Sequence, residues 1–326
     1  MPIDTNFRFS HDHNQPLGAE ALKSLTEDGT DFLQLLRGLV GSEPADQPRR
    51  VWQGTGFNMI WRPNFGGQSG NTAHFLQLNM TGETLSFTDI SGDTGIANRS
   101  LFEKDIFLGG AAYLQEIVDT FDNSGQHFEP GVFNLVPATT DPNEPVTVVR
   151  MGSIPHGTTI NMQGIAFEVV EPRIDPVSIT PFVIGDPTSL VPFPEEDLSN
   201  ALDSRTDLAR VPGLDQAHLD DPNQFLRDAL DGQTIDRTVV IQLTTRAADP
   251  IPPEVGGGVA NIAFLEGTEN GPNADVPLAQ STFWIETGTD RDGSPLLQLQ
   301  YTQMVLLDFN GLSWPHVTVA TLRPQG

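Results

Sequence analysis

Short segments that alternate apolar and polar residues dominate the chain from about residue 50 onward. In the segment from Thr84 to Ile90, for example, Leu85 and Phe87 alternate with polar neighbours. A period of two predicts strands with one buried face. Candidate strands cover residues 56–61, 74–80, 84–90, 127–136, 147–151, 158–170, 238–245, 260–265, 282–287, 296–307 and 316–322. Residues 111–119 fit a helix or a strand.

This series of about a dozen strands, together with 31 glycines and 26 prolines, predicts an all-β fold. We expect an antiparallel closed β-barrel whose interior could hold a ligand. The predicted barrel domain spans residues 51–323.

Two regions depart from the strand pattern. Residues 1–50 carry the helically spaced Phe32, Leu35, Leu36 and Leu39, which predict an N-terminal helical extension. Residues 171–235 are rich in proline and contain a short predicted helix from Asp221 to Leu230. We expect this segment to be an insertion that lies over the barrel and could reach across its mouth.

The charge balance limits the partners of this chain. It has 43 acidic and 17 basic residues and a net charge of −26, so nucleic acid and anionic membrane surfaces would repel it. It has no cysteine, which excludes disulfides and thiolate ligands. No secretory pattern is visible at the start, and no apolar run approaches the roughly 18 residues of a membrane span. We therefore expect a cytoplasmic protein.

His316 is the first candidate for chemistry. It opens the last candidate strand, directly after Pro315, whose ring fixes the backbone that leads into it. A histidine restrained in this way suits an iron or zinc ligand, although a strand-end histidine with its tip in water has the same pattern.

Two further histidines are candidates. His156 lies in a Pro-His-Gly sequence, which predicts a turn at the barrel rim or a hydrogen-bond donor at its mouth. His127 and Glu129 share one strand face, because they are two residues apart. With His316 they could form a two-histidine, one-carboxylate metal set.

Three segments resemble the nitrobindin family of heme-binding β-barrels. Trp52-Gln53-Gly54-Thr55-Gly56 resembles the family's opening Trp-x-Gly-x-Gly strand. His127-Phe128-Glu129-Pro130-Gly131 resembles its His-x-Glu-x-Gly strand. Leu299 to Met304, followed by Trp314-Pro315-His316-Val317, resembles the closing pair of strands. The order of the three matches, and the resemblance covers roughly residues 51–170 and 236–323.

The resemblance implies a calycin-like barrel that holds heme b at one open end. His316 would be the proximal iron ligand, and His127 would line the opposite side and steer an oxidant by hydrogen bonding. Met151, Met304 and Phe133 would also face the pocket. Ferric heme in such a site would bind nitric oxide or isomerise peroxynitrite to nitrate, so the partners would be small oxidants.

Two alternatives stay open at this point. The barrel could be a non-catalytic carrier of an apolar small molecule, or a heme enzyme of the peroxidase or dehydratase type. The negative charge would repel an anionic oxidant unless a local arginine such as Arg150 offsets it. The sequence carries no signal of oligomeric state.

Overall fold

The computed structural model describes residues 49–67, 69–91, 95–141, 143–144, 146–246 and 257–325. The predicted N-terminal extension lies outside this range, except for its last two residues, which begin the first strand. Within the described residues the barrel strands are β1 (Arg49–Pro63), β2 (His74–Asp89), β4 (Ile106–Asp119), β5 (Gly125–Val136), β8 (Thr147–Ile154), β9 (Thr158–Val169), β12 (Thr234–Thr244), β14 (Asp275–Thr289), β15 (Pro295–Phe309) and β16 (Leu312–Pro324).

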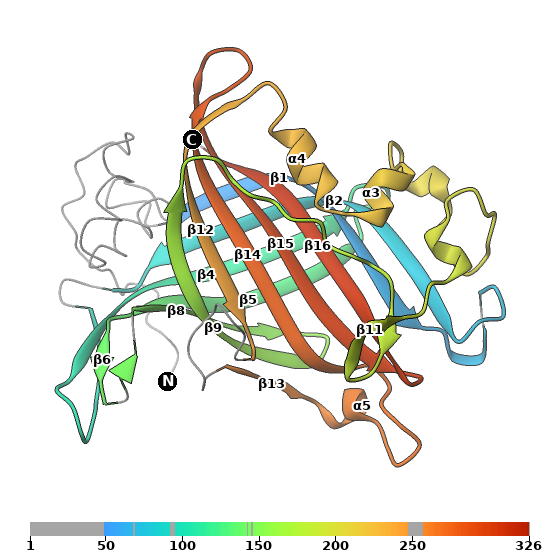
Figure 1. The fold of residues 1–326 in the computed structure, drawn as a ribbon, viewed down its shortest axis with the longest axis horizontal. Coiled ribbons are helices and arrows are strands. Elements are labelled where there is room, and N and C mark those ends of the chain that lie inside the picture. Colours follow the sequence, from blue (N-terminus) through green and yellow to red (C-terminus); the bar gives the residue numbers. More distant parts are fainter. Residues whose placement is uncertain are drawn as a thin grey trace.

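These strands form a closed antiparallel barrel (Figure 1). Each strand pairs with the next in the order just given, and β1 closes the sheet by pairing with β16 from Trp52↔Pro324 to Ile60↔His316. The expected fold class is therefore confirmed. Residues 111–119 belong to strand β4, and the two candidate strands at 74–80 and 84–90 are parts of the single strand β2.

Side chains alternate between the barrel interior and its outer surface. Along β8, Val148, Arg150 and Ile154 are buried, whereas Met151 and Ser153 are exposed. This is the pattern expected for a sheet with one face on a core and one face in water. The alternation therefore tells which residues can reach an internal ligand.

The insertion covers one outer wall of the barrel. It contains β10 (Phe182–Val183), β11 (Asp186–Leu190), η2 (Pro194–Glu196), η3 (Leu208–Arg210), α3 (Gln216–Asp220) and α4 (Gln224–Ala229). The ring of Phe225 in α4 lies 5.0 Å from that of Phe57 in β1. The indole Nε1 of Trp61 donates to the carbonyl of Ile179 at 2.9 Å. Helix α4 follows the cap residue Asn223, two residues later than the predicted cap at Asp221.

The remaining elements lie outside the ten-strand path. They are β3 (Ile96–Asn98), which pairs with β4, the small hairpin of β6 (Thr139–Thr140) and β7 (Asn143–Glu144), the turn η1 (Phe65–Gly67), β13 (Gly258–Asn261) and α5 (Ala263–Glu266). Strand β13 adds to the edge of β9, and α5 follows it directly. The predicted strand at 260–265 is therefore a short strand and the start of a helix.

One half of the barrel interior is filled by a packed core. Phe133 lies at its centre, with ring centroids 6.0 Å from Phe87, 5.1 Å from Tyr113 and 5.6 Å from Phe283. All four side chains are buried. Aromatic rings at these separations and tilted angles pack favourably. Because this half is filled by side chains, a ligand inside the barrel would have to bind in the opposite half.

Candidate functional site

A cavity of about 350 Å³ occupies the barrel interior at the end where β16 begins. Its wall includes the aliphatic side chains of Ile60, Ile117, Ile154, Ile160, Val305 and Leu307. Small-molecule sites are commonly concave, mostly apolar and a few hundred Å³ in size, with a few polar groups that orient the ligand. The cavity has these properties.

Three histidines line this one cavity. His316 comes from β16, His127 from β5 and His156 from the turn between β8 and β9. The rings of His127 and His156 lie 6.1 Å apart. The structure therefore brings together the three histidines that the sequence singled out, from segments almost 200 residues apart.

The ring of His316 is anchored by one hydrogen bond. Its Nε2 lies 2.7 Å from Oδ1 of Asn58, a residue on the neighbouring strand β1. The hydroxyl of Thr318 donates to the same oxygen at 2.8 Å. When Nε2 donates to Asn58, the neutral ring carries its lone pair on Nδ1. Asn58 thus fixes both the orientation and the tautomer of His316.

His316 is neutral at physiological pH. Burial is the main cause, and the nearby imidazoles of His127 and His156 add to it, so that the pKa of His316 falls to about 3. A neutral imidazole is the form that can donate a lone pair to a metal or accept a proton.

His127 is held by a buried ion pair beneath the cavity. Its Nε2 lies 3.0 Å from Oε2 of Glu129, whose side chain is fully buried. The other carboxylate oxygen accepts hydrogen bonds from Tyr113 and, at 2.8 Å, from Arg150. Burial alone would raise the pKa of Glu129, but the charge of Arg150 and the bond from His127 lower it to about 2. Glu129 therefore stays ionised and orients His127.

Arg150 does not line the cavity and belongs to the packed half of the barrel interior. Its guanidinium is 1% exposed and also donates to Gln303 at 2.6 Å and to Tyr113 at 3.1 Å. All of its charge is therefore engaged inside the protein. The expectation that Arg150 could offset the negative field for an approaching anion is not met, because the alternation of β8 points this side chain into the packed interior.

Three of the expected pocket residues do not line the cavity. Met151 is 37% exposed and lies on the outer face, because it follows the inward-facing Arg150. Met304 stands between the cavity residues Gln303 and Val305, points the other way and packs, half-buried, against other apolar residues. Phe133 points inward but belongs to the packed half of the barrel. The prediction that these three residues face the pocket is therefore wrong.

Sequence reasoning missed Asn58 and Arg62. Both lie on β1, on the same face as Ile60, and both line the cavity. Their signal was present in the alternation of Asn58, Ile60 and Arg62 along the first strand. Because Ile60 pairs directly with His316, this alternation also places Asn58 and Arg62 on either side of that histidine.

The segment after β13 contributes residues to the cavity lining. Among the described residues that line the cavity, none comes from the insertion, whereas Leu265 of α5 and the following Ala274 and Val276 do. The backbone N–H of Ile262 donates to the carbonyl of Gly157, beside His156, at 2.9 Å. The segment after β13 therefore borders the opening. The insertion adjoins the edge of β2 nearby, where the backbone N–H of Thr206 donates to the carbonyl of Leu76 at 3.0 Å.

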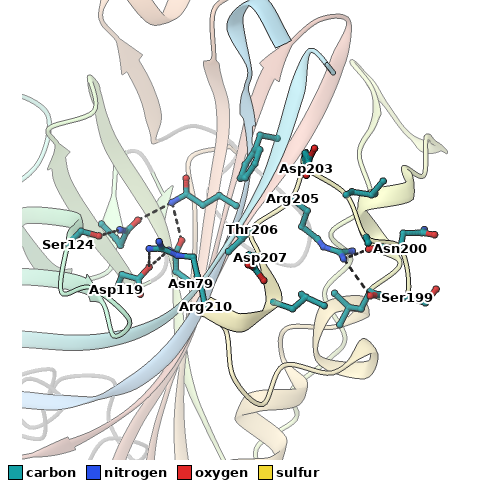
Figure 2. A pocket seen from close by; sticks show the side chains of 17 residues that line it. Asn79, Asp119, Ser124, Ser199, Asn200, Asp203, Arg205, Thr206, Asp207 and Arg210 are labelled. Atoms are coloured by element: carbon teal, nitrogen blue, oxygen red, sulfur yellow. Dashed lines mark hydrogen bonds and ion pairs between the residues drawn. The ribbon is translucent and has the colours of Figure 1, made fainter. Parts of the chain in front are cut away.

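A second, larger hollow of about 810 Å³ lies between the insertion and β2 (Figure 2). Its two arginines are engaged within the protein. Arg205 donates to backbone carbonyls that include those of Asp197, at 2.7 Å, and Asn200, at 2.6 Å. Arg210 pairs with Asp122 at 2.5 Å. We do not assign this hollow as the functional site, because none of the three cavity histidines lines it.

The described residues contain no group of three or more His, Asp or Glu side chains placed to hold a metal ion. Glu129 illustrates the reason, since its two oxygens are already bound by Arg150, Tyr113 and His127. The set of His127, Glu129 and His316 therefore receives no support as a zinc or non-heme iron site, which requires three or four converging ligands.

The fold and the site define a closed antiparallel β-barrel with a histidine-lined internal cavity. No protein-family model and no curated protein matches the chain. Among solved structures, the crystal structure of Rv2717c from M. tuberculosis is similar, with 13% sequence identity and a TM-score of 0.37 over 90% of this chain and 97% of that one. Within the described residues no helix is long and apolar enough to span a bilayer.

Proposed function

We propose that this protein binds heme b in the open half of the barrel, with His316 as the axial ligand of the iron. The observation that carries the proposal is a neutral imidazole, fixed by Asn58, in the wall of an apolar cavity. The resemblance of the His127 and His316 segments to heme-binding barrels supports the same choice.

The chemistry of the cavity fits such a group. A porphyrin supplies four of the iron ligands, so the protein needs to contribute only one or two. One histidine is then sufficient, which agrees with a site that lacks a cluster of three ligating side chains among the described residues. The aliphatic wall would bury the apolar macrocycle, and the bond to Asn58 would keep the His316 lone pair available.

His127 would act on a molecule bound in the same cavity. Its Nε2 is occupied by Glu129, so its remaining nitrogen, Nδ1, can contact a ligand. Bound ferric heme would supply a centre that binds nitric oxide or isomerises peroxynitrite to nitrate. His127 would orient the small oxidant, and the buried Glu129 would hold the imidazole ring in place through its bond to Nε2.

A spectroscopic titration tests the proposal. We expect the wild-type protein to shift and sharpen the Soret band of hemin, and the His316→Ala variant to lose more than about 100-fold in affinity, since outer partners of a ligand alone are worth about 10- to 100-fold. His156→Ala is the matched control, because it removes a histidine of the same cavity that we do not assign as the ligand. Equal binding by wild type and His316→Ala would refute the proposal.

The aliphatic wall also favours a second candidate, a carrier of an apolar small molecule. In that case His316 would be a polar group of the pocket without a metal. The wild-type protein would then leave the Soret band of free hemin unchanged, and mass spectrometry of the purified protein would find a bound lipid-like molecule.

A further inference from the structure

The cavity differs in charge from the rest of the protein. The chain has a net charge of −26, yet among the described residues that line the cavity there is no aspartate and no glutamate. The ionisable lining side chains are three histidines, the buried Tyr301 and one arginine, Arg62. Such a site favours a ligand that carries negative charge, because a local cation with no competing carboxylate attracts an anion even within an acidic protein.

Two neighbouring side chains, Gln77 and Phe75, orient the guanidinium of Arg62. Its Nε donates to Oε1 of Gln77 at 3.0 Å, and its guanidinium stacks over the ring of Phe75 at 4.4 Å from the centroid. The side chain is half-buried. These contacts fix the plane of the guanidinium and use one of its five N–H donors, which leaves the terminal fork for another acceptor.

No carboxylate of the described residues forms an ion pair with Arg62. This sets it apart from Arg150, Arg210, Arg227 and Arg237, each of which pairs with an aspartate or a glutamate. A guanidinium fork is well matched to a carboxylate, which it can bind through two parallel hydrogen bonds. Arg62 is therefore built like an ion-pair partner whose counter-ion the protein does not supply.

Arg62 also lies next to the proposed ligand position. Ile60 pairs with His316 across the β1–β16 seam, and Arg62 is two residues further along the same face of β1. Two residues of a strand span roughly 6.6 Å. A ligand that reaches His316 and the aliphatic wall can thus extend a polar end to Arg62.

We propose that Arg62 recognises a carboxylate of the cavity ligand, so that the ligand is an apolar molecule with an acidic end. The inference rests on the cavity of the proposed function but not on iron. A porphyrin with free propionates and a fatty acid share this chemistry, and the two sources are separated by the probes below.

The first test compares each acid with its ester. Hemin and hemin dimethyl ester differ only in their carboxylates, as do cis-parinaric acid and its methyl ester. Dissociation constants are measured with wild type, Arg62→Gln, Arg62→Lys and Arg173→Gln, the last as a control that removes an exposed arginine of the insertion. Urea unfolding of each variant verifies that it is folded.

We expect wild type to bind the acid at least about 10-fold more tightly than the ester, as a charge-assisted bidentate pair would give. Arg62→Gln should remove this preference by weakening the acid alone, Arg62→Lys should keep part of it, and Arg173→Gln should keep all of it. Selectivity in the hemin pair supports a porphyrin, and selectivity in the parinarate pair alone supports a fatty acid and refutes the heme proposal. Equal binding of acid and ester by wild type, or binding of neither acid, overturns the role of Arg62.

Discussion

The two halves of the barrel interior each contain an arginine, and the two arginines are used in opposite ways. In the packed half, Arg150 is 1% exposed and its guanidinium meets Glu129, Tyr113 and Gln303. In the open half, Arg62 is half-buried, stacks on Phe75 and donates one side-chain hydrogen bond, to the amide oxygen of Gln77. One arginine completes a scaffold, whereas the other is oriented by the scaffold and left with free donors.

The histidines differ in a similar way. Nε2 of His127 is tied through the charged Glu129 to the buried network, whereas Nε2 of His316 is bound by the neutral Asn58. Buried polar groups that satisfy one another stabilise a single conformation, but they have little capacity left for a ligand. The difference locates binding capacity in the half where side chains are oriented and only partly satisfied.

The largest effect is expected from breaking the packed half. Arg150→Met leaves the carboxylate of Glu129 buried without its cation, and removing one partner of a buried ion pair typically costs about 3–5 kcal/mol. We expect a loss of this size in the free energy of unfolding measured in urea at pH 7. The double variant Arg150→Met/Glu129→Gln should regain most of the loss, because no unpaired charge stays buried. A single variant as stable as wild type would show that the network is not structural.

Removing Leu226 tests whether the insertion supports the wall without touching the cavity. Leu226 is 1% exposed, and its carbonyl accepts from Gln300 on the outer face of β15 at 3.0 Å. Leu226→Ala should lower the free energy of unfolding by about 2–5 kcal/mol. At a temperature where the variant is folded, its affinity for hemin should equal that of wild type. A change in affinity without a change in stability would give the insertion a role at the mouth.

Local pattern predicted the barrel because each strand carries its own alternation, which depends only on neighbouring residues. It also identified His127, His156 and His316, because proline and strand context restrain them. The positions of Met151 and Phe133 required more, namely the register of β8 and the division of the interior into two halves. The strand register and the packing of side chains inside the barrel depend on contacts between distant strands. A single sequence does not reveal these contacts.

The sequence did not predict the role of Arg62 for the same reason. The alternation of the first strand places Arg62 on the inward face, but it does not distinguish a binding role from the structural role of another inward arginine such as Arg150. We infer the role of Arg62 from two observations. Among the described residues no carboxylate pairs with Arg62, and the pairing of Ile60 with His316 places Arg62 near that histidine. Long-range pairing therefore separates a binding arginine from a structural one such as Arg150.

Stability should depend on pH through Glu83, a buried carboxyl that accepts hydrogen bonds from Tyr301 and Thr81. Burial raises the pKa of Glu83 to about 7, although bonds from Tyr301, Thr81 and Gln115 work against the shift. Tyr301, the partner of Glu83, also responds to the buried ion pair: the charge of Arg150 lowers the pKa of Tyr301, and the charge of Glu129 raises it. Since the folded protein holds this proton more tightly than the unfolded chain, stability is fully present below about pH 4.5 and is lost as the pH rises through about 7.

We expect Glu83→Gln to be more stable than wild type at pH 8 by about 2–3 kcal/mol and to differ little at pH 4. The measurement is urea unfolding at both pH values. Glu286, whose pKa burial also raises to about 7, provides a second carboxyl of the same kind, and Glu286→Gln should remove its own part of the slope. An unchanged pH dependence in Glu83→Gln would mean that this carboxyl is ionised in the folded protein.

The open half is tested most finely by the partner of His316. Asn58→Leu keeps the approximate size of the side chain but removes the oxygen that accepts from Nε2. The ring would then be free to change tautomer and orientation, and loss of such a partner typically costs about 10- to 100-fold in affinity for the bound metal group. We expect this loss in hemin titrations, with His316 still able to give a Soret band. Thr318→Val is the control, because it removes a neighbour of Asn58 without removing the bond to His316. If Asn58→Leu and Thr318→Val bind hemin equally well, the orientation of His316 does not depend on Asn58, and the distinction between His316, held by a neutral amide, and His127, held by the charged Glu129, fails.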